Sequence, residues 1–436
     1  MSRRTPETRR DNEAYVPGHG DPSLRVLSYD IDLDVKLAGN HVEGEALLQV
    51  EPVAGPLERF TLNLHRLKVV KVTVDGGPAK VTHRGVRLTI VPRRPLPAGR
   101  TSTVRIRYAG NPTQVRGIDG LAGWEELEDG VIVASQPHGS PSWFPCNDRP
   151  GDKARYRYSI TTDNDYEVVA NGSLVATRRR SSRTTWIYEQ PEPMASYLAT
   201  LQIGRYATRD VPGSVTPVRL HFPPLLRAQV EAGPMMRHGD MIEAFSELFG
   251  PYPFARYDVV ITEDPLEIPL EAQTLSIFGS NYVAPGWERE RLVAHELAHQ
   301  WFGNSVTLEH WRDIWLHEGF ACYSEWLWSE RSGGRPAAAH AQMHYRGLAR
   351  KAQDLLLADP SPQKMFDDRV YKRGACLLHA LRERVGDERF FALLRSWCAR
   401  HRYGTVTTAM FVAEAAAVTG VKPAWFDPWL YETPLP

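Results

Sequence analysis

The sequence has no long apolar run and no net charge of either sign. No stretch of its 436 residues approaches the ~18 consecutive apolar residues that a membrane-spanning helix needs. Several arginines stand near the N-terminus, but no apolar stretch follows them, so we expect neither a signal peptide nor an anchor. The 52 basic and 52 acidic residues cancel, and a neutral chain has no overall field that attracts nucleic acid or an anionic membrane. We therefore expect neither of these partners.

Cysteine is also scarce. The sequence has four cysteines that are far apart and form no CxxC pair, namely Cys146, Cys322, Cys376 and Cys398. Such a small, scattered set in a long chain argues against a disulfide framework. We expect buried thiols in a reducing compartment and, since no leader is evident, a cytoplasmic protein.

The periodicity of apolar residues changes once along the chain. From Leu24 to about Tyr206 apolar and polar residues alternate, as in Tyr29–Val35, and turn signals separate the runs. This pattern predicts an antiparallel β-sandwich. After about Pro212 the apolar spacing becomes mostly helical. We expect an α+β protein with a disordered tail (1–21), a β-sandwich domain (22–205) and a mainly helical domain (206–436).

A histidine pair with helical spacing is the strongest chemical signal. Residues 295–299 read His-Glu-Leu-Ala-His between apolar flanks, which predicts a buried helix. His295 and His299 then project from one face, one turn apart, and can hold one Zn²⁺. Glu296 is rotated by about 100°, so we expect it to act as a catalytic base rather than as a ligand. The alternative, two hydrogen-bonded core histidines, is costly because three polar side chains would be buried without a common partner.

A third ligand is predicted further along the chain. Glu318 stands inside the apolar, helical segment Trp311–Ala321, and eighteen residues separate it from His299. That length allows a turn and a return helix that presents Glu318 to both histidines. Three protein ligands with one open position are typical of a catalytic zinc site, so we expect one Zn²⁺ per chain.

Other polar residues near these segments have different interpretations. Glu325 lies two turns after Glu318 on the same helix face, and it and Asp313 are candidates for orienting the ligand histidines. His340 and His344 repeat the histidine spacing, but no glutamate follows the first of them. We interpret that second pair as surface or core histidines. Cys322 is not needed as a ligand, since three are already present.

With these motifs the sequence resembles the gluzincin aminopeptidases, the family of aminopeptidase N and leukotriene hydrolase. The resemblance rests on motifs spread over most of the chain: Trp143–Pro150, Pro193–Thr200, His295–Asn304, Trp315–Ala321 and Tyr371–Ala375. It implies a thermolysin-like catalytic domain after the β-sandwich. Because the chain ends at about the end of that domain, the resemblance also implies a two-domain form without the C-terminal helical domain of larger members.

The resemblance implies further site residues. Tyr371 would stabilise the oxyanion, and Glu271 would bind the free amine of the substrate. Gln136 and His138 would lie beside the substrate, with His138 in place of a family glutamate. Around Glu271 the glycine, methionine and asparagine of the family's Gly-x-Met-Glu-Asn motif are replaced, which weakens the expected amine anchor.

Three functions compete on this evidence. The leading prediction is an aminopeptidase that hydrolyses the N-terminal peptide bond of peptides with a free N-terminus, through a metal-activated water. A zinc endopeptidase or a broad hydrolase with a loosened anchor is the close alternative, and an inactive binding scaffold is the third. The complete set of His295, Glu296, His299, Glu318 and Tyr371 argues against a scaffold. The sequence predicts no oligomeric state.

Overall fold

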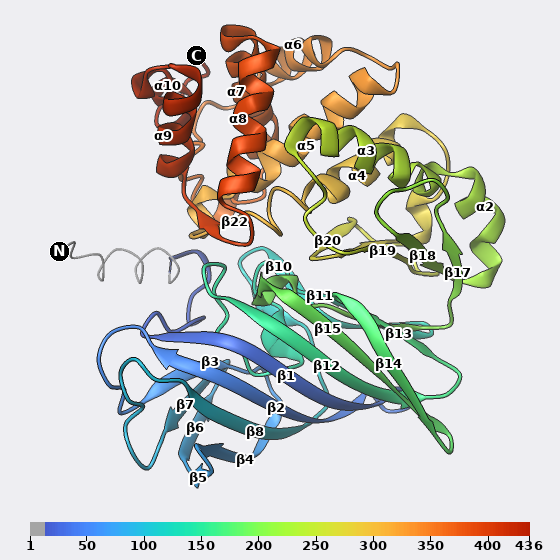
Figure 1. Cartoon of the computed structure of the whole chain (residues 1–436), viewed down its shortest axis with the longest axis vertical. Coiled ribbons are helices and arrows are strands. Elements are labelled where there is room, and N and C mark those ends of the chain that lie inside the picture. Colours follow the sequence, from blue (N-terminus) through green and yellow to red (C-terminus); the bar gives the residue numbers. More distant parts are fainter. Residues whose placement is uncertain (1–13) are drawn as a thin grey trace. The chain divides into compact units, whose positions relative to one another are not determined.

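The computed structural model describes residues 14–436, which form two compact units (Figure 1). The first unit runs to Ala207 and includes Ala272–Leu275; the second comprises Thr208–Glu271 and Ser276–Pro436. The sequence prediction placed the boundary after residue 205 and assigned residues 272–275 to the second domain. The structure assigns this short turn to the first unit, where Asn171 Nδ2 donates to the Gln273 carbonyl at 2.7 Å.

Only the second part of the predicted disordered tail, residues 1–21, belongs to the described residues. Residues 1–13 lie outside the described residues. From residue 14 onward the prediction is wrong, because Tyr15 and Val16 are buried and Gly20 N donates to Asn63 Oδ1 at 2.7 Å. His19 also lies 2.7 Å from the buried carboxylate of Asp148. Apolar burial and specific hydrogen bonds therefore hold residues 14–21 to the first unit.

The first unit is β-rich, as predicted. Its largest sheet has eight strands, in the order β14 (Ser173–Arg180), β15 (Arg183–Ala195), β12 (Lys153–Asp163), β1 (Leu24–Lys36), β2 (His41–Pro52), β8 (Ser102–Gly110), β4 (Lys68–Val74) and β5 (Gly77–Pro78). A second sheet has the order β13 (Glu167–Ala170), β16 (Leu201–Gly204), β11 (Gly130–Ala134), β10 (Gly120–Leu127) and β9 (Val115–Gly117). A third contains β3 (Phe60–Asn63), β7 (Arg87–Val91) and β6 (Lys80–Arg84).

Strand β1 shows both what alternation predicts and what it misses. Ile31, Leu33 and Val35 are fully buried, while the aspartates between them stay accessible. Strand β1 pairs antiparallel with β2 but parallel with β12, with Ser28 opposite Arg155. The expectation of a purely antiparallel sandwich is wrong here. A tight turn fixes the direction of β2, whereas β12 arrives after a long connection that permits either direction.

The second unit begins with a five-stranded sheet and continues as a helical assembly (Figure 1). The sheet has the order β17 (Ala207–Asp210), β18 (Val218–Phe222), β19 (Tyr257–Ile261), β21 (Leu275–Phe278) and β20 (Leu270–Ala272). The helices are α2 (Arg227–Ala232), α3 (His238–Phe249), α4 (Trp287–Ala298), α5 (Trp315–Arg331), α6 (Ala337–Leu348), α7 (Asp368–Val385), α8 (Asp387–Arg400), α9 (Thr408–Thr419) and α10 (Asp427–Leu430). Strands β22 (Thr307–Leu308) and β23 (Thr405–Val406) pair in parallel. Within residues 14–436 no helix has the length and apolar character needed to cross a bilayer.

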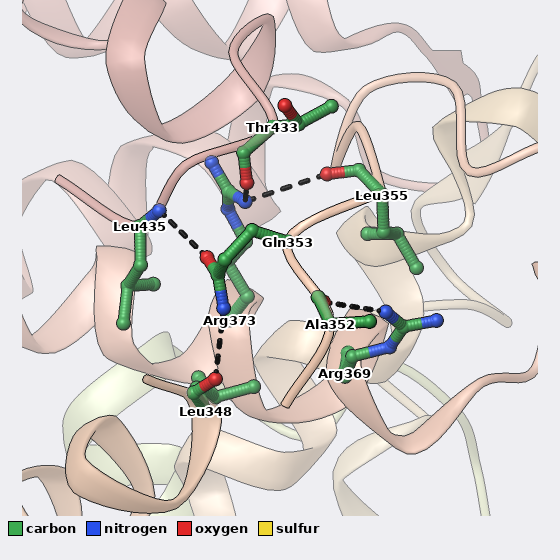
Figure 2. Close-up of a pocket in the computed structure, with 8 residues that line it drawn as sticks. All are labelled: Leu348, Ala352, Gln353, Leu355, Arg369, Arg373, Thr433 and Leu435. Atoms are coloured by element: carbon green, nitrogen blue, oxygen red, sulfur yellow. Dashed lines mark hydrogen bonds between the residues drawn. The ribbon is translucent and has the colours of Figure 1, made fainter. Parts of the chain in front are cut away.

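A buried arginine ties the C-terminal segment to the helices (Figure 2). Arg373 on α7 is 4% exposed, and its guanidinium donates to main-chain carbonyls instead of to a carboxylate. The acceptors at 2.6–2.9 Å are the carbonyl oxygens of Pro428, Trp429, Glu432 and Thr433. Nearby, Leu435 N donates to Gln353 Oε1 at 2.9 Å, as Figure 2 shows. One side chain therefore satisfies much of the backbone of residues 428–434.

Replacing Arg373 by glutamine is expected to lower the free energy of unfolding of the helical unit by about 3 kcal/mol, because one buried and several part-buried carbonyls lose a charged donor. Thermal and denaturant unfolding would measure this loss. Arg350→Gln, at an exposed position after α6, is the matched control and should change stability by less than about 0.5 kcal/mol. Equal stability of the two variants would contradict this account of the C-terminal segment.

Candidate metal centre

Helix α4 carries the predicted histidine pair. The helix begins after Gly286, and Glu288 and Glu290 in its first turn complement the positive end of the helix dipole. Its last turns are buried through Val293, Ala294, Leu297 and Ala298, so the polar residues between them are held inside the unit. His295 is 6% exposed and His299, which caps the helix, is 1% exposed.

Helix α5 brings Glu318 to both histidines. Glu318 Oε2 lies 3.4 Å from His295 Nε2 and 3.5 Å from His299 Nε2. One ligand atom from each of the three side chains lies within 4.8 Å of the others, and all three residues are buried. The structure thus brings together the three residues that the sequence selected as metal ligands.

The other ring nitrogen of each histidine is already engaged. His295 Nδ1 donates to Glu325 Oε1 at 2.8 Å, and His299 Nδ1 donates to the Phe302 carbonyl at 3.0 Å. Both Nε2 atoms therefore face Glu318, where a bound cation can replace the proton that each ring otherwise holds toward that carboxylate. The carbonyl of Phe302 was not predicted. It can approach because Gly303 has φ +136° and a Cβ at that position would lie 3.3 Å from His299 Nδ1.

Asp313 does not orient a ligand histidine, so that prediction is wrong. Its Oδ1 accepts hydrogen bonds from Thr408 N at 3.1 Å and Thr408 Oγ1 at 2.5 Å, at the start of α9. Each ligand histidine has one Nδ1–H to donate. Glu325 accepts the hydrogen bond from His295 and the Phe302 carbonyl accepts that from His299, so neither donor is left for Asp313. Asp313 instead fixes the segment before α5 to the N-terminus of α9.

The charges of the cluster fit a dication. Burial alone would lower the pKa of His295 and His299, but the surrounding carboxylates raise these values to about 9 and about 10. Burial raises the pKa of Glu318, yet the two histidines outweigh it and lower the pKa below its usual range. The cluster therefore attracts positive charge strongly. Two imidazole nitrogens and one carboxylate at this spacing form a donor set that suits Zn²⁺.

Two further carboxylates lie beside the ligands. Glu271 on β20, Glu296 on α4 and His299 also bring one ligand atom each within 4.8 Å of one another. Burial raises the pKa of Glu296 to about 8, with the histidines opposing the shift, and burial likewise raises the pKa of Glu271. Glu296 is thus a buried carboxyl held next to the ligand set, where it can exchange a proton with a group bound there.

Tyr371, near the start of α7, lies beside the cluster. Its ring stacks on His295 with centroids 5.9 Å apart and planes 21° from parallel. Burial and the neighbouring carboxylates raise the pKa of its hydroxyl, so it stays protonated and can donate a hydrogen bond. The structure therefore places the phenol next to the predicted ligands.

A glycine contact sets the approach of α7 to α5. A Cβ on Gly374 would lie 2.8 Å from Gly319 Cα, and a Cβ on Gly319 would lie 2.9 Å from Gly374 Cα. Such distances are too short for any side chain at either position. Glu318 directly precedes Gly319 on α5, and Tyr371 lies about one turn before Gly374 on α7. The contact therefore controls how close the phenol lies to the ligand carboxylate.

Gly374→Ala is therefore expected to move α7 away from α5 and reduce kcat about tenfold or more, because a displacement near 1 Å weakens catalytic geometry strongly. Steady-state kinetics on the variant would measure the change. Gly347→Ala on α6, where a Cβ meets no atom within 4 Å, is the control and should retain full activity. A Gly374→Ala enzyme with wild-type kcat would show that the helix spacing does not matter.

The remaining candidates from the sequence have the following surroundings. Gln136 and His138 belong to the first unit; His138 is 3% exposed and donates from Nε2 to the Val115 carbonyl at 3.1 Å. His340 and His344 stack with Trp326, and the His344 and Trp326 centroids are 5.2 Å apart. This second pair is structural, as expected. All four cysteines are free and buried, also as expected.

Two cations that act on Glu325 were not predicted from the sequence. Arg291 Nη1 donates to Glu325 Oε2 at 3.2 Å, and the charge of Lys372 acts on the same carboxylate. One signal was readable: Arg291 precedes His295 by one helical turn and so lies on its face of α4. Lys372 had no local signal, because its approach depends on the packing of α7 against α5.

Comparisons with known proteins agree with this architecture. The model of the peptidase M1 N-terminal domain matches residues 26–198, and that of the peptidase family M1 domain matches residues 235–429. The M1 zinc metallopeptidase of Deinococcus radiodurans, in a mutant bound to a Tyr-Ser-Ala substrate, aligns with a TM-score of 0.88 and 30% identity over 98% of each chain. Yeast LTA4 hydrolase shares the fold, with a TM-score of 0.80 and 20% identity over 95% of this chain and 69% of the other.

Curated relatives are similar over a smaller share of their own length. The leucyl aminopeptidase of Saccharolobus solfataricus is 25% identical over 84% of this chain and 48% of its own. Endoplasmic reticulum aminopeptidase 1 of Homo sapiens is 25% identical over 86% of this chain and 44% of its own. The chain thus spans about half the length of these relatives.

The β-rich unit and the helical unit that carries the His-Glu-x-x-His helix give this chain the fold of a two-domain zinc metallopeptidase. The chain belongs to peptidase family M1, since the family matches and the Deinococcus alignment together cover both units.

Proposed function

We propose that this protein is a zinc-dependent aminopeptidase that removes N-terminal residues from peptides. The observation that carries the proposal is the buried cluster of His295, His299 and Glu318, which can hold one Zn²⁺ per chain. The curated relatives are named as aminopeptidases, and the Deinococcus neighbour is a zinc metallopeptidase bound to a tripeptide. Both facts support the same reaction class.

The chain's own residues divide the work of hydrolysis. Zn²⁺ in such a site supplies Lewis-acid polarisation and lowers the pKa of water. Glu296, held beside the ligand set, would take the proton of the attacking water and then deliver it to the leaving amine. Tyr371 donates from its phenol to the oxygen on which negative charge develops. Glu325 and the Phe302 carbonyl hold the two histidines in the required tautomer.

Glu271 is proposed to select a free N-terminus. Its carboxylate lies beside Glu296 and His299, so an ammonium group bound to it would stand a fixed short distance from the scissile bond. Gln136 and His138 of the first unit are proposed as further substrate contacts. Burial and the charge of His19 lower the pKa of His138, so its ring is neutral and adds no negative charge for an ammonium. Glu271 would therefore be the main anchor.

Blocking the substrate amine tests this anchor. A peptide with a free N-terminus is expected to be cleaved with a kcat/KM at least about 10²-fold above that of its N-acetylated form, since the blocked form loses a buried ion pair. Glu271→Gln should remove most of that difference. Glu267→Gln, four residues earlier in the chain, serves as the control. Equal cleavage of free and acetylated peptides would support the endopeptidase or broad-hydrolase alternative.

A single assay separates the enzyme from the inactive scaffold. Hydrolysis of an aminoacyl chromogenic amide should occur, stop when a chelator removes the metal, and return when Zn²⁺ is added. No hydrolysis in the zinc-loaded protein would favour the scaffold.

We also propose a reducing, cytoplasmic location. Four buried free thiols are compatible with it. Localisation of a tagged full chain by fractionation would test this point separately from the chemistry.

A further inference from the structure

The carboxylate of Glu325 bridges a ligand histidine and an arginine. Its Oε1 accepts from His295 Nδ1 at 2.8 Å, and its Oε2 accepts from Arg291 Nη1 at 3.2 Å. Glu325 is 3% exposed, so water cannot replace either donor. The two oxygens of one buried carboxylate are thus divided between the candidate metal centre and a cation outside it.

Arg291 reaches Glu325 from a partly exposed position. It lies on α4 one turn before His295, and its side chain is 29% exposed. Its Nε donates to Glu288 Oε2 at 2.9 Å, but Glu288 is 78% exposed and contributes little in water. The guanidinium therefore lies between solvent and the buried site. Of its two ion pairs, the one with the buried Glu325 is the stronger.

Lys372 supports the same carboxylate from another helix. It stands next to Tyr371 on α7, and its Nζ donates to Cys322 Sγ at 3.3 Å. Cys322 lies one turn before Glu325 on α5, so this hydrogen bond holds the ammonium on the same face of the helix as the carboxylate. Two cations from α4 and α7 thus compensate one buried anion.

This compensation becomes essential when a metal occupies the site. A histidine that binds a cation through Nε2 is a neutral imidazole and can donate only Nδ1–H, so it offers Glu325 a dipole instead of a charge. A buried carboxylate without a cationic partner is costly, and the cost would favour a rotated side chain that releases His295. Arg291 removes that cost at a fixed geometry.

We propose that Arg291 is a positioning residue that acts through Glu325 to hold His295 in the orientation that binds the metal, with Lys372 as a second counter-charge. The inference rests on the proposed function in one respect, namely that a metal occupies His295 Nε2. It extends that function by assigning a role in metal retention to an arginine that touches neither metal nor substrate.

Zinc affinity, measured on the full chain by competition with a chromogenic chelator, tests the inference without reference to activity. Arg291→Gln is expected to weaken Zn²⁺ binding about 10–100-fold, the usual effect of losing a group that orients a ligand. Arg291→Lys should recover part of this loss. Arg289→Gln is the control: Arg289 lies two residues away on another face of α4 and donates to the Asn281 carbonyl, so it should bind Zn²⁺ like the wild type.

A double-mutant cycle decides whether Arg291 acts through Glu325. If it does, Arg291→Gln adds little to the loss caused by Glu325→Gln, whereas independent effects would add. The absorption spectrum of the Co²⁺-loaded protein should also change in Arg291→Gln, which a purely structural role would not produce. Full additivity, or wild-type Zn²⁺ affinity in Arg291→Gln, overturns the inference. A wild-type protein that binds no Zn²⁺ would instead contradict the proposed function itself.

Discussion

Replacing Glu296 by glutamine is expected to lower kcat by about 10²–10⁴-fold, the contribution of a positioned general base, while zinc content stays at the wild-type level. Glutamine has nearly the same shape but cannot accept a proton at neutral pH. Its amide would still lie beside His299 and Glu271, so the ligand set would remain intact. Steady-state kinetics together with elemental analysis of the same preparation would measure both effects.

The control for this experiment lies on the same helix. Glu288→Gln makes the same chemical change at a position that is 78% exposed, and it should leave kcat and zinc content unchanged. A zinc-loaded Glu296→Gln enzyme that turns over at the wild-type rate would refute the role of Glu296. Loss of zinc in that variant would mean that Glu296 helps to retain the metal.

Replacing Tyr371 by phenylalanine has the second-largest expected effect, a fall in kcat of about 10²–10³-fold with little change in KM. Removal of one donor to a developing oxyanion typically costs this much. The ring would still stack on His295, since only the hydroxyl is removed. Binding in the ground state should therefore persist while stabilisation of the transition state is lost.

Measurement of kcat and KM separately distinguishes this role from simple substrate binding. Tyr345→Phe on α6, whose hydroxyl donates to the Pro436 carbonyl away from the cluster, is the matched control and should behave like the wild type. A Tyr371→Phe enzyme with unchanged kcat and a raised KM would show that the hydroxyl binds substrate and does not stabilise charge.

The local elements of the fold were predictable because their signals are local. The alternation around Ile31 and Leu33 corresponds to β1, and the apolar flanks of His295 correspond to the buried end of α4. The parallel pairing of β1 with β12 was not predictable, since it joins segments more than a hundred residues apart and depends on how a long connection closes.

The candidate site shows the same division. Spacing within one helix selected His295 and His299, and an acidic residue in an apolar segment selected Glu318. Asp313 fulfilled the same compositional criterion, yet it bonds Thr408 because α9, distant in sequence, presents two donors to it. The carbonyl of Phe302 has no side-chain signal at all, because a main-chain acceptor becomes visible only when the turn at Gly303 is known.

Crystals of protein purified without added metal, measured with X-rays on both sides of the zinc absorption edge, would test the central claim most directly. The account predicts one anomalous peak per chain, about 2.0–2.2 Å from His295 Nε2, His299 Nε2 and an oxygen of Glu318. A well-ordered structure with no peak there after soaking in Zn²⁺, or with a peak that excludes Glu318, would contradict it.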